Sequence, residues 1–388
     1  MTEIKLMETH MRAPHLNSWD FYNPVKIHFG TKSRTILKNK LAGQKLLVVT
    51  TMRGREQFKA DPILGALQAE IVWVVSVNSN PSLTETQIEI NRLAGQNFDA
   101  IVAFGGGSAM DVAKALAAAL TPGLRCRDLA TLIAQPELHL DRPLLTIHAV
   151  TTTSGTGSEV TPFATIWDRE NRKKLSLTSA FLFPTTAIVD PELTYDLPLA
   201  ETLSTSLDAM NQAFESVWNR NRNPVTTRLA ARAIELSFEA IPQLAADIDN
   251  HTARALIAEA SLLAGLCISQ TRTAICHSMS YPLTAHFGLA HGMACAFTMG
   301  AVADLVLENA PESLAEIATL NGLKTAEALI AQLHSMLHEV NLSSQCHATL
   351  PSTKALLELR GEMHTIGRAD NFILEVSNET LKYVLDQS

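Results

Sequence analysis

Short apolar runs alternate with stretches of helical spacing through the first half of the chain. Four runs have the near-continuous hydrophobicity of buried strands, at residues 45–50, 71–75, 98–104 and 144–147. Such strands, separated by helices, are typical of a parallel sheet that is covered on both faces. We therefore expect a doubly wound α/β domain in this half of the chain.

The pattern changes near Pro198. Ala- and Leu-rich stretches at 229–246 and 252–266 carry apolar residues at helical spacing, and strand signals become rare. This half is predicted to be all-helical. Because 388 residues are too many for one compact core, we expect two domains, 1–197 and 198–388.

Composition narrows the classes of function. The net charge of −8 argues against a protein that binds nucleic acid or an anionic membrane through a basic face. The N-terminus lacks the apolar core of a signal peptide, and no long apolar run predicts a membrane span. The five cysteines form no C-x-x-C pair, which predicts neither a disulfide framework nor a zinc knuckle. These features favour a soluble globular enzyme in a reducing cytoplasm.

Three successive glycines at 105–107 follow a predicted strand and precede an Ala-rich helix at 112–120. Glycine lets the backbone approach a phosphate closely, and the amides at a helix N-terminus attract negative charge. Ser108 and Asp111 have the spacing of a capping box, so a plain capped turn is the alternative. The G-x-G-x-x-G fingerprint of the common dinucleotide turn is absent.

A hydroxyl- and glycine-rich segment, TTTSGTGSE at 151–159, follows the fourth predicted strand. Such a segment can line the same crevice and donate hydrogen bonds to a pyrophosphate. A flexible polar loop is the alternative, and the residues do not decide between the two.

A carboxylate and two imidazoles form a candidate metal site. His277 and His291 lie 14 residues apart, and Asp208 stands in a helix of otherwise small and apolar residues. This ligand set suits zinc or ferrous iron. Packed or surface histidines and a helix-surface acid are the alternatives, and spacing does not decide between them.

These segments together resemble the iron-containing, or group III, alcohol dehydrogenase family. The matching stretches follow the family's order and spacing, at residues 105–114 (GGGSAMDVAK), 151–159, 190–191, 207–215 and 277–292. The resemblance implies a dinucleotide-binding N-terminal domain, an all-helical C-terminal domain and an active site in the cleft between them. It implies NAD or NADP as cofactor, with one divalent metal, zinc or iron.

The resemblance also assigns site residues. It places the phosphate region of the cofactor at Gly105, Gly106, Gly107, Ser108 and Asp111. It places Thr151, Thr152, Ser154 and Gly157 along the cofactor cleft, and Lys174 near the nicotinamide ribose. Asp208, His277 and His291 fall on three of the family's metal-ligand positions.

Two positions depart from the family pattern. The usual D-x-x-x-H motif has Gln212 in place of its histidine, and an amide oxygen is a weaker ligand for zinc or iron than imidazole. Gln212 is either a ligand or a group that supports one. Tyr281 stands one helical turn after His277, where many members have another histidine. Tyr281 and His286 are candidates for the proton relay, although packing beside the pocket is favoured for Tyr281.

The residues around Tyr281 are most similar to the phosphonoacetaldehyde reductase, or hydroxyethylphosphonate dehydrogenase, branch. Arg272 stands five residues before His277, where members often have glycine. A planar guanidinium suits bidentate recognition of a phosphonate or sulfonate. We therefore expect a small anionic aldehyde as substrate, with a generic short-chain alcohol or glycerol dehydrogenase as the alternative.

The end of the predicted strand at 45–50 bears on the choice between NAD and NADP. NAD-selective relatives often have Asp where Thr51 stands, and Arg53 and Arg55 follow. A 2′-phosphate would not be repelled there, which favours NADP. The family implies a homodimer or a larger homo-oligomer. A lyase-type synthase of the same architecture, or a non-catalytic cofactor-binding relative, remains as a further alternative.

Overall fold

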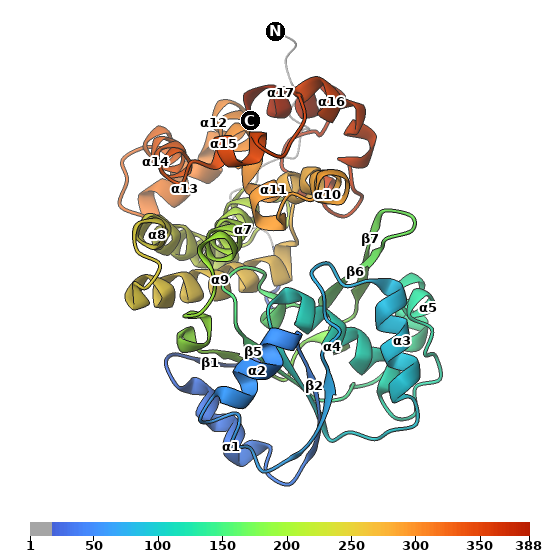
Figure 1. Cartoon of the computed structure of the whole chain (residues 1–388). Coiled ribbons are helices and arrows are strands. Elements are labelled where there is room, and N and C mark those ends of the chain that lie inside the picture. Colours follow the sequence, from blue (N-terminus) through green and yellow to red (C-terminus); the bar gives the residue numbers. More distant parts are fainter. Residues whose placement is uncertain (1–17) are drawn as a thin grey trace. The chain divides into compact units, whose positions relative to one another are not determined.

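The computed structural model describes residues 18–388, which form two compact units (Figure 1). Asn23–Leu197 form the α/β unit, and Pro198–Ser388 form the helical unit. Residues 18–22 belong with the helical unit, where the Tyr22 amide donates to Gln270 Oε1 at 3.1 Å. From the sequence we expected these residues in the first domain. Their contact with Gln270 joins residues far apart in the sequence, so no local sequence pattern could have predicted it.

A parallel sheet forms the centre of the α/β unit, as the apolar runs predict. Within the described residues it has six strands in the spatial order β1-β8-β5-β4-β2-β3, all parallel to their neighbours. The strands are β1 (Lys26–Phe29), β2 (Lys45–Val49), β3 (Glu70–Val74), β4 (Ala100–Gly105), β5 (Ile147–Thr151) and β8 (Thr186–Val189). The predicted fold class is confirmed.

The sheet differs from the prediction at its fourth strand and at strands that the pattern missed. The run at 144–147 ends where β5 begins, because Leu144 and Leu145 pack on the core from the connecting segment. Polar residues within β5, such as His148, interrupt the apolar pattern, so the rest of that strand was not predicted. β1 and β8 are only four residues long, and the antiparallel hairpin β6 (Phe163–Asp168) and β7 (Lys173–Thr178) stands outside the main sheet.

Alternate residues of the central strands face different layers of helices. On β2, Leu47 and Val49 pack in a cluster with α3 (Leu83–Leu93) and α4 (Gly107–Leu120). The intervening Leu46 and Val48 pack with Phe58 of α2 (Met52–Ala60) on the opposite face. This alternation explains why the strands are hydrophobic throughout rather than at every second residue.

The helical unit has one large apolar core. Its three longest helices pack against one another: α7 (Leu199–Val217), α8 (Pro224–Ala246) and α9 (His251–Thr271). The others are α10 (Ile275–Phe287), α11 (His291–Phe297), α12 (Met299–Asn309), α13 (Pro311–Leu320), α14 (Ala326–Glu339), α15 (Leu342–His347), α16 (Thr353–Glu358) and α17 (Asn378–Gln387). The structure thus extends both helices predicted from the Ala- and Leu-rich stretches.

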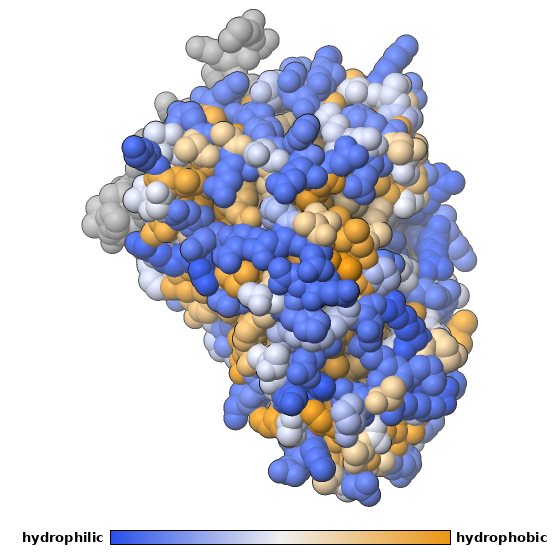
Figure 2. Space-filling view, turned by 60° about the vertical axis from the view of Figure 1, so that its left-hand side comes forward, coloured by the Kyte–Doolittle hydropathy of each residue, from blue (hydrophilic) through white to orange (hydrophobic). Residues whose placement is uncertain are grey.

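Among residues 18–388, one helix, α9, is long and apolar enough by length and composition to cross a membrane. Its position explains that composition, because α9 packs against α7 and α8 inside the helical core. On the face shown in Figure 2, hydrophilic residues cover most of the surface. The apolar character of α9 is therefore that of a core helix.

A buried histidine on the central strand β5 makes the stability of the α/β unit depend on pH. His148 is 2% exposed, and no described residue hydrogen-bonds its Nδ1. Burial and, less strongly, the charge of Lys40 lower the pKa of His148 to about 4. The unfolded chain therefore binds this proton at a higher pH than the folded chain, and stability falls as pH drops from about 6.5 towards 4.

We expect His148→Leu to remove this loss. At pH 5 the histidine destabilises the fold by about 2 kcal/mol relative to pH 7, whereas leucine fills similar volume without a proton to bind. Urea unfolding of both proteins at pH 7 and pH 5 measures the difference. Equal losses of unfolding free energy in the two proteins would contradict the assignment.

Candidate metal centre and cofactor turn

The glycine turn lies where the order of the strands reverses. The chain passes from β2 outward to β3, and then returns to the other side of β2 to form β4. In open α/β sheets the crevice at the carboxyl ends of such strands is the usual ligand site. Thr51 follows β2 and Gly105 ends β4, so both predicted cofactor residues lie at this reversal.

Backbone geometry requires glycine at the turn. Gly105 has φ +154°, and a Cβ there would lie 2.8 Å from Cβ of Ala109. A Cβ on Gly106 or Gly107 would come within 2.8 Å of the side chain of Thr153 or Thr156, respectively. The two predicted phosphate-binding segments therefore lie directly against each other.

The predicted capping box does not form. Helix α4 begins at Gly107, before Ser108, and its N-cap Gly106 has no side chain. Asp111 instead accepts hydrogen bonds from Ser158 Oγ at 2.9 Å and from the Thr165 amide at 3.0 Å. Its carboxylate therefore links α4 to the loop at Ser158 and to β6. The helix begins at the glycines without a side-chain cap.

The segment at 151–157 is ordered by the neighbouring strands. The Thr152 amide donates to the Gly105 carbonyl at 3.0 Å, and Thr151 Oγ1 donates to the Ile188 carbonyl of β8. Ser154 is buried, and Gly157 has φ +62°, a left-handed conformation that favours glycine. The alternative of a flexible loop does not describe this segment.

A buried lysine anchors the same loop, and the sequence reasoning gave it no role. Lys114 Nζ donates to the Ser158 carbonyl at 2.7 Å, to Ser158 Oγ at 2.9 Å and to the Phe163 carbonyl at 2.8 Å. Burial lowers the pKa of Lys114 to about 8, although Asp111 and Glu159 act against it. Its position one helical turn after Asp111 on α4 is the sequence feature from which this role could have been predicted.

The residues that bear on cofactor selection are engaged within the α/β unit. Thr51 caps α2 by accepting from the Gly54 amide at 2.9 Å. Arg53 donates to the Asp196 carbonyl, and Arg55 lies over the ring of Trp73. Both guanidinium groups therefore have other partners in this structure, which weakens the support they give to NADP.

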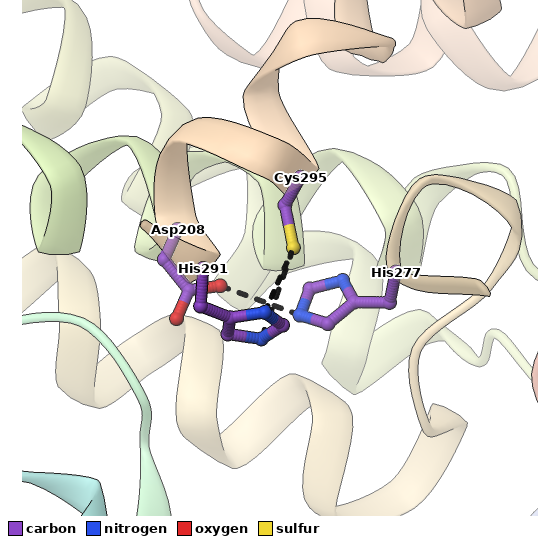
Figure 3. A group of neighbouring side chains, drawn as sticks. All are labelled: Asp208, His277, His291 and Cys295. Atoms are coloured by element: carbon purple, nitrogen blue, oxygen red, sulfur yellow. Dashed lines mark hydrogen bonds and ion pairs between the residues drawn. The ribbon is translucent and has the colours of Figure 1, made fainter. Parts of the chain in front are cut away.

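The three predicted metal ligands converge within the helical unit. Asp208 comes from α7, His277 from the first turn of α10, and His291 is the first residue of α11. His277 Nε2 lies 3.3 Å from Asp208 Oδ1, and the two imidazole rings are 5.4 Å apart between centroids. A fourth group, Cys295, joins them, so that one ligand atom from each residue lies within 4.8 Å of the others (Figure 3).

A glutamate orients His277, and this role was missed from the sequence. Glu215 is fully buried on the face of α7 that also carries Asp208. Its carboxylate accepts from the backbone amides of Ala274 and His277 at 2.9 and 3.1 Å, and from His277 Nδ1 at 2.7 Å. With the ring proton on Nδ1, the lone pair of Nε2 faces Asp208. The i, i+7 spacing from Asp208 was the signal.

The ionisable groups of the cluster shift one another's pKa. Burial raises the pKa of Cys295, but His277 and His291 outweigh it and bring the pKa to about 7. Burial lowers the pKa of His277, yet negative charge at Cys295 and Glu215 and the Asp208 carboxylate beside its Nε2 raise it well above its ordinary value. The pKa of Asp208 is lowered by His277 and His291 although burial, the largest influence, raises it.

The donor set fits a divalent metal. Asp208 Oδ1 and Gln212 Oε1 are buried, and neither accepts a hydrogen bond from any residue in the described range. Gln212 also hydrogen-bonds to the Asp208 carboxylate, which is the supporting role that we left open. A carboxylate oxygen and an imidazole lone pair that face each other at 3.3 Å suit a cation that both can bind.

The two predicted proton-relay residues lie differently. Tyr281 is buried, and its ring stacks on that of His291 with 6.4 Å between centroids. His286 directs Nε2 to Glu362 Oε2 at 2.9 Å and is not part of the cluster. Packing beside the cluster, the interpretation that we favoured for Tyr281, agrees with this arrangement.

Arg272, the predicted substrate residue, ends α9 in an unusual conformation. Its φ is +63°, and its carbonyl accepts from Thr271 Oγ1 at 2.8 Å and from Asn219 Nδ2 at 3.3 Å. Burial, and then the neighbouring positive charge of Arg368, lower its pKa to about 10. A second guanidinium near Arg272 concentrates positive charge there.

Family models match both parts of the chain. The model for iron-containing alcohol dehydrogenases matches residues 24–191, and that for the C-terminal part of the Fe-containing alcohol dehydrogenase family matches residues 202–349. The chain belongs to the iron-containing alcohol dehydrogenase family. It is therefore an oxidoreductase that acts on alcohols, and the cofactors expected from the sequence, NAD(P) and a divalent metal, are those of the family.

Relatives with assigned activities differ in substrate. The chain is 38% identical over 229 residues to phosphonoacetaldehyde reductase from Streptomyces viridochromogenes, a match that spans 58% of each chain. It is 30% identical to 1,3-propanediol dehydrogenase from Klebsiella pneumoniae, over 84% of this chain and 87% of the relative. The solved structure of sulfoacetaldehyde reductase from Bifidobacterium kashiwanohense, in complex with NAD+, has a TM-score of 0.83 and 28% identity and covers 96% of this chain and 98% of its own.

Proposed function

We propose that this alcohol dehydrogenase reduces a small anionic aldehyde, bearing a phosphonate or sulfonate, to the primary alcohol. The convergence of Asp208, His277 and His291 carries the proposal of a metal-dependent reaction. Two similar proteins, a phosphonoacetaldehyde reductase and a sulfoacetaldehyde reductase, support the anionic substrate. We also propose a cytoplasmic homodimer or larger homo-oligomer.

Asp208, His277 and His291 would hold the metal, and the glycine turn at 105–107 would hold the phosphates of the dinucleotide. When bound, the metal polarises the carbonyl oxygen and the reduced nicotinamide supplies a hydride. Glu215 keeps the lone pair of His277 Nε2 directed at the site through its hydrogen bond to Nδ1. Tyr281, stacked on His291, is the nearer candidate for a proton donor than His286, which is paired with Glu362.

Arg272 would recognise the anionic group of the substrate. Its guanidinium is half-buried and lies in the field of Arg368, so an anion gains from two positive charges in a partly desolvated place. Glycine, which many family members have at this position, suits φ +63° without strain. Arg272 therefore stands in a backbone conformation that favours glycine.

We expect Arg272→Gly to raise KM for phosphonoacetaldehyde or sulfoacetaldehyde by about 10- to 100-fold, because a hydrogen bond to a charged group contributes about 1.5–3 kcal/mol. KM for propanal should change little. Steady-state rates with the three aldehydes measure the contrast, and Arg360→Ala, at an exposed arginine, is the matched control. Equal effects on charged and neutral aldehydes would reject the role of Arg272.

The similarity to 1,3-propanediol dehydrogenase supports a second candidate, a reductase of neutral short-chain aldehydes. The kinetics of the unmodified enzyme distinguish the two candidate functions. A higher kcat/KM for an anionic aldehyde than for 3-hydroxypropanal or propanal favours the first proposal. The reverse order favours the second, and a protein that binds NAD(P)H without turning over any aldehyde would be the non-catalytic relative.

A further inference from the structure

The thiol of Cys295 belongs to the proposed metal site by position. Cys295 lies four residues after His291 on α11, so both side chains project from the same face of the helix. It is fully buried, and its Sγ lies 3.8 Å from Nδ1 and 3.8 Å from Nε2 of His291. In Figure 3 the sulfur points toward the two histidines of the cluster.

The surroundings of this sulfur differ from those of other thiols in the chain. Cys267 Sγ donates to the Thr226 carbonyl at 3.4 Å, and Cys346 Sγ donates to the Met293 carbonyl at 3.8 Å. These thiols behave as small buried groups with a backbone acceptor. Cys295 Sγ instead faces the imidazole nitrogens of His291, which are candidate metal donors.

Two of the separations fall in the range expected of a tetrahedral zinc site. Around zinc with bonds of about 2.0–2.3 Å, the ligand atoms lie about 3.3–3.8 Å apart. Asp208 Oδ1 and His277 Nε2 are 3.3 Å apart, and Cys295 Sγ lies 3.8 Å from each ring nitrogen of His291. Gln212, where the family's usual motif has a histidine, offers a neutral amide oxygen, and its amide hydrogen-bonds to Asp208.

We propose that Cys295 is the fourth protein ligand of the metal, in place of the histidine that Gln212 replaces, and that the resulting donor set selects zinc over ferrous iron. This inference rests on the proposed function, because it assumes a metal between Asp208, His277 and His291. A thiolate is a softer ligand than an amide or carboxylate oxygen and suits zinc. Zinc also accepts a fifth ligand, so four protein donors do not close the site to a substrate.

Cobalt(II) as a zinc substitute tests the sulfur ligand independently of activity. Metal-free protein titrated with Co²⁺ should show the visible bands of tetrahedral cobalt together with a near-ultraviolet sulfur-to-cobalt charge-transfer band. In Cys295→Ser the charge-transfer band should disappear while visible bands remain. The matched control Cys267→Ser, at a buried thiol outside the cluster, should keep both.

The contrary outcomes separate the two proposals. Visible bands without a charge-transfer band in the unmodified protein would reject Cys295 as a ligand and leave the metal site standing. A protein that binds no Co²⁺ would reject the metal site itself, and with it the sulfur ligand. A charge-transfer band that survives Cys295→Ser would assign the sulfur to another cysteine and overturn the inference.

Competition between metals tests the selectivity. With equal Zn²⁺ and Fe²⁺ under anaerobic conditions, the unmodified protein should retain zinc, as measured by elemental analysis. Cys295→Ser should lower zinc affinity by more than the roughly 10- to 100-fold that loss of an outer-shell partner costs, and should reduce the ratio of zinc to iron. An unchanged ratio would contradict selection by the thiolate.

Discussion

Asp208→Asn should abolish metal binding and reduce turnover of the aldehyde by at least about 1,000-fold. The substitution keeps the shape of the side chain but removes the only carboxylate of the cluster, and the Lewis-acid contribution of a metal is several kcal/mol. Metal analysis of the purified variant, followed by steady-state rates with NAD(P)H, measures both effects.

Two controls keep this result interpretable. Asp249→Asn, at an exposed carboxylate of the helical unit, should retain metal and activity. Binding of NAD(P)H to Asp208→Asn, followed by its fluorescence, should match the unmodified protein, because the glycine turn belongs to the α/β unit. Full turnover in a metal-free Asp208→Asn protein would contradict the metal role.

Gly292→Ala should disrupt the same site through the backbone. A Cβ at Gly292 would lie 1.8 Å from the Ser204 carbonyl oxygen of α7, a contact that only movement of α11 relieves. His291 and Cys295 would move with α11, away from Asp208. Displacement of catalytic groups by about 1 Å costs about 100-fold in rate, and overpacking costs about 1–3 kcal/mol of stability.

The matched control for this methyl group is Gly361→Ala. No atom lies within 4 Å of a Cβ built on Gly361, and its φ is not positive. Thermal unfolding, zinc affinity and kcat/KM of both variants measure the contrast. Equal behaviour of the two alanine variants would show that the close approach of α11 to α7 does not position the metal ligands.

The fold could be predicted where burial on both faces makes a strand continuously apolar. β2 and β4 satisfy that condition. β3, at the edge of the sheet, is half-buried over most of its length but packs on both faces, and the positions of all three strands followed from the sequence. β1 and β8 are too short to give a pattern, and the polar residues of β5 conceal most of that strand. Tertiary partners, rather than local propensity, define these three strands.

The site could be predicted only in part, for a related reason. Asp208, His277 and His291 were candidate ligands by residue type, the family resemblance placed them at metal-ligand positions, and the structure brings them together. Glu215 stands seven residues after Asp208 and Cys295 four residues after His291, which are spacings common on any helix, so neither residue was singled out from the sequence. The S-x-x-D spacing at Ser108 predicted a cap, but the helix begins one residue earlier and Asp111 bonds to another segment.

Reconstitution of the metal-free enzyme tests the central claim most directly. The protein would be stripped of metal, loaded with increasing Zn²⁺, and assayed for NAD(P)H oxidation with phosphonoacetaldehyde and sulfoacetaldehyde while bound metal is measured. The account predicts activity that rises in proportion to bound metal and reaches its limit at one ion per chain. Turnover that persists without metal, or one ion bound per chain with no reduction of any aldehyde, would contradict it.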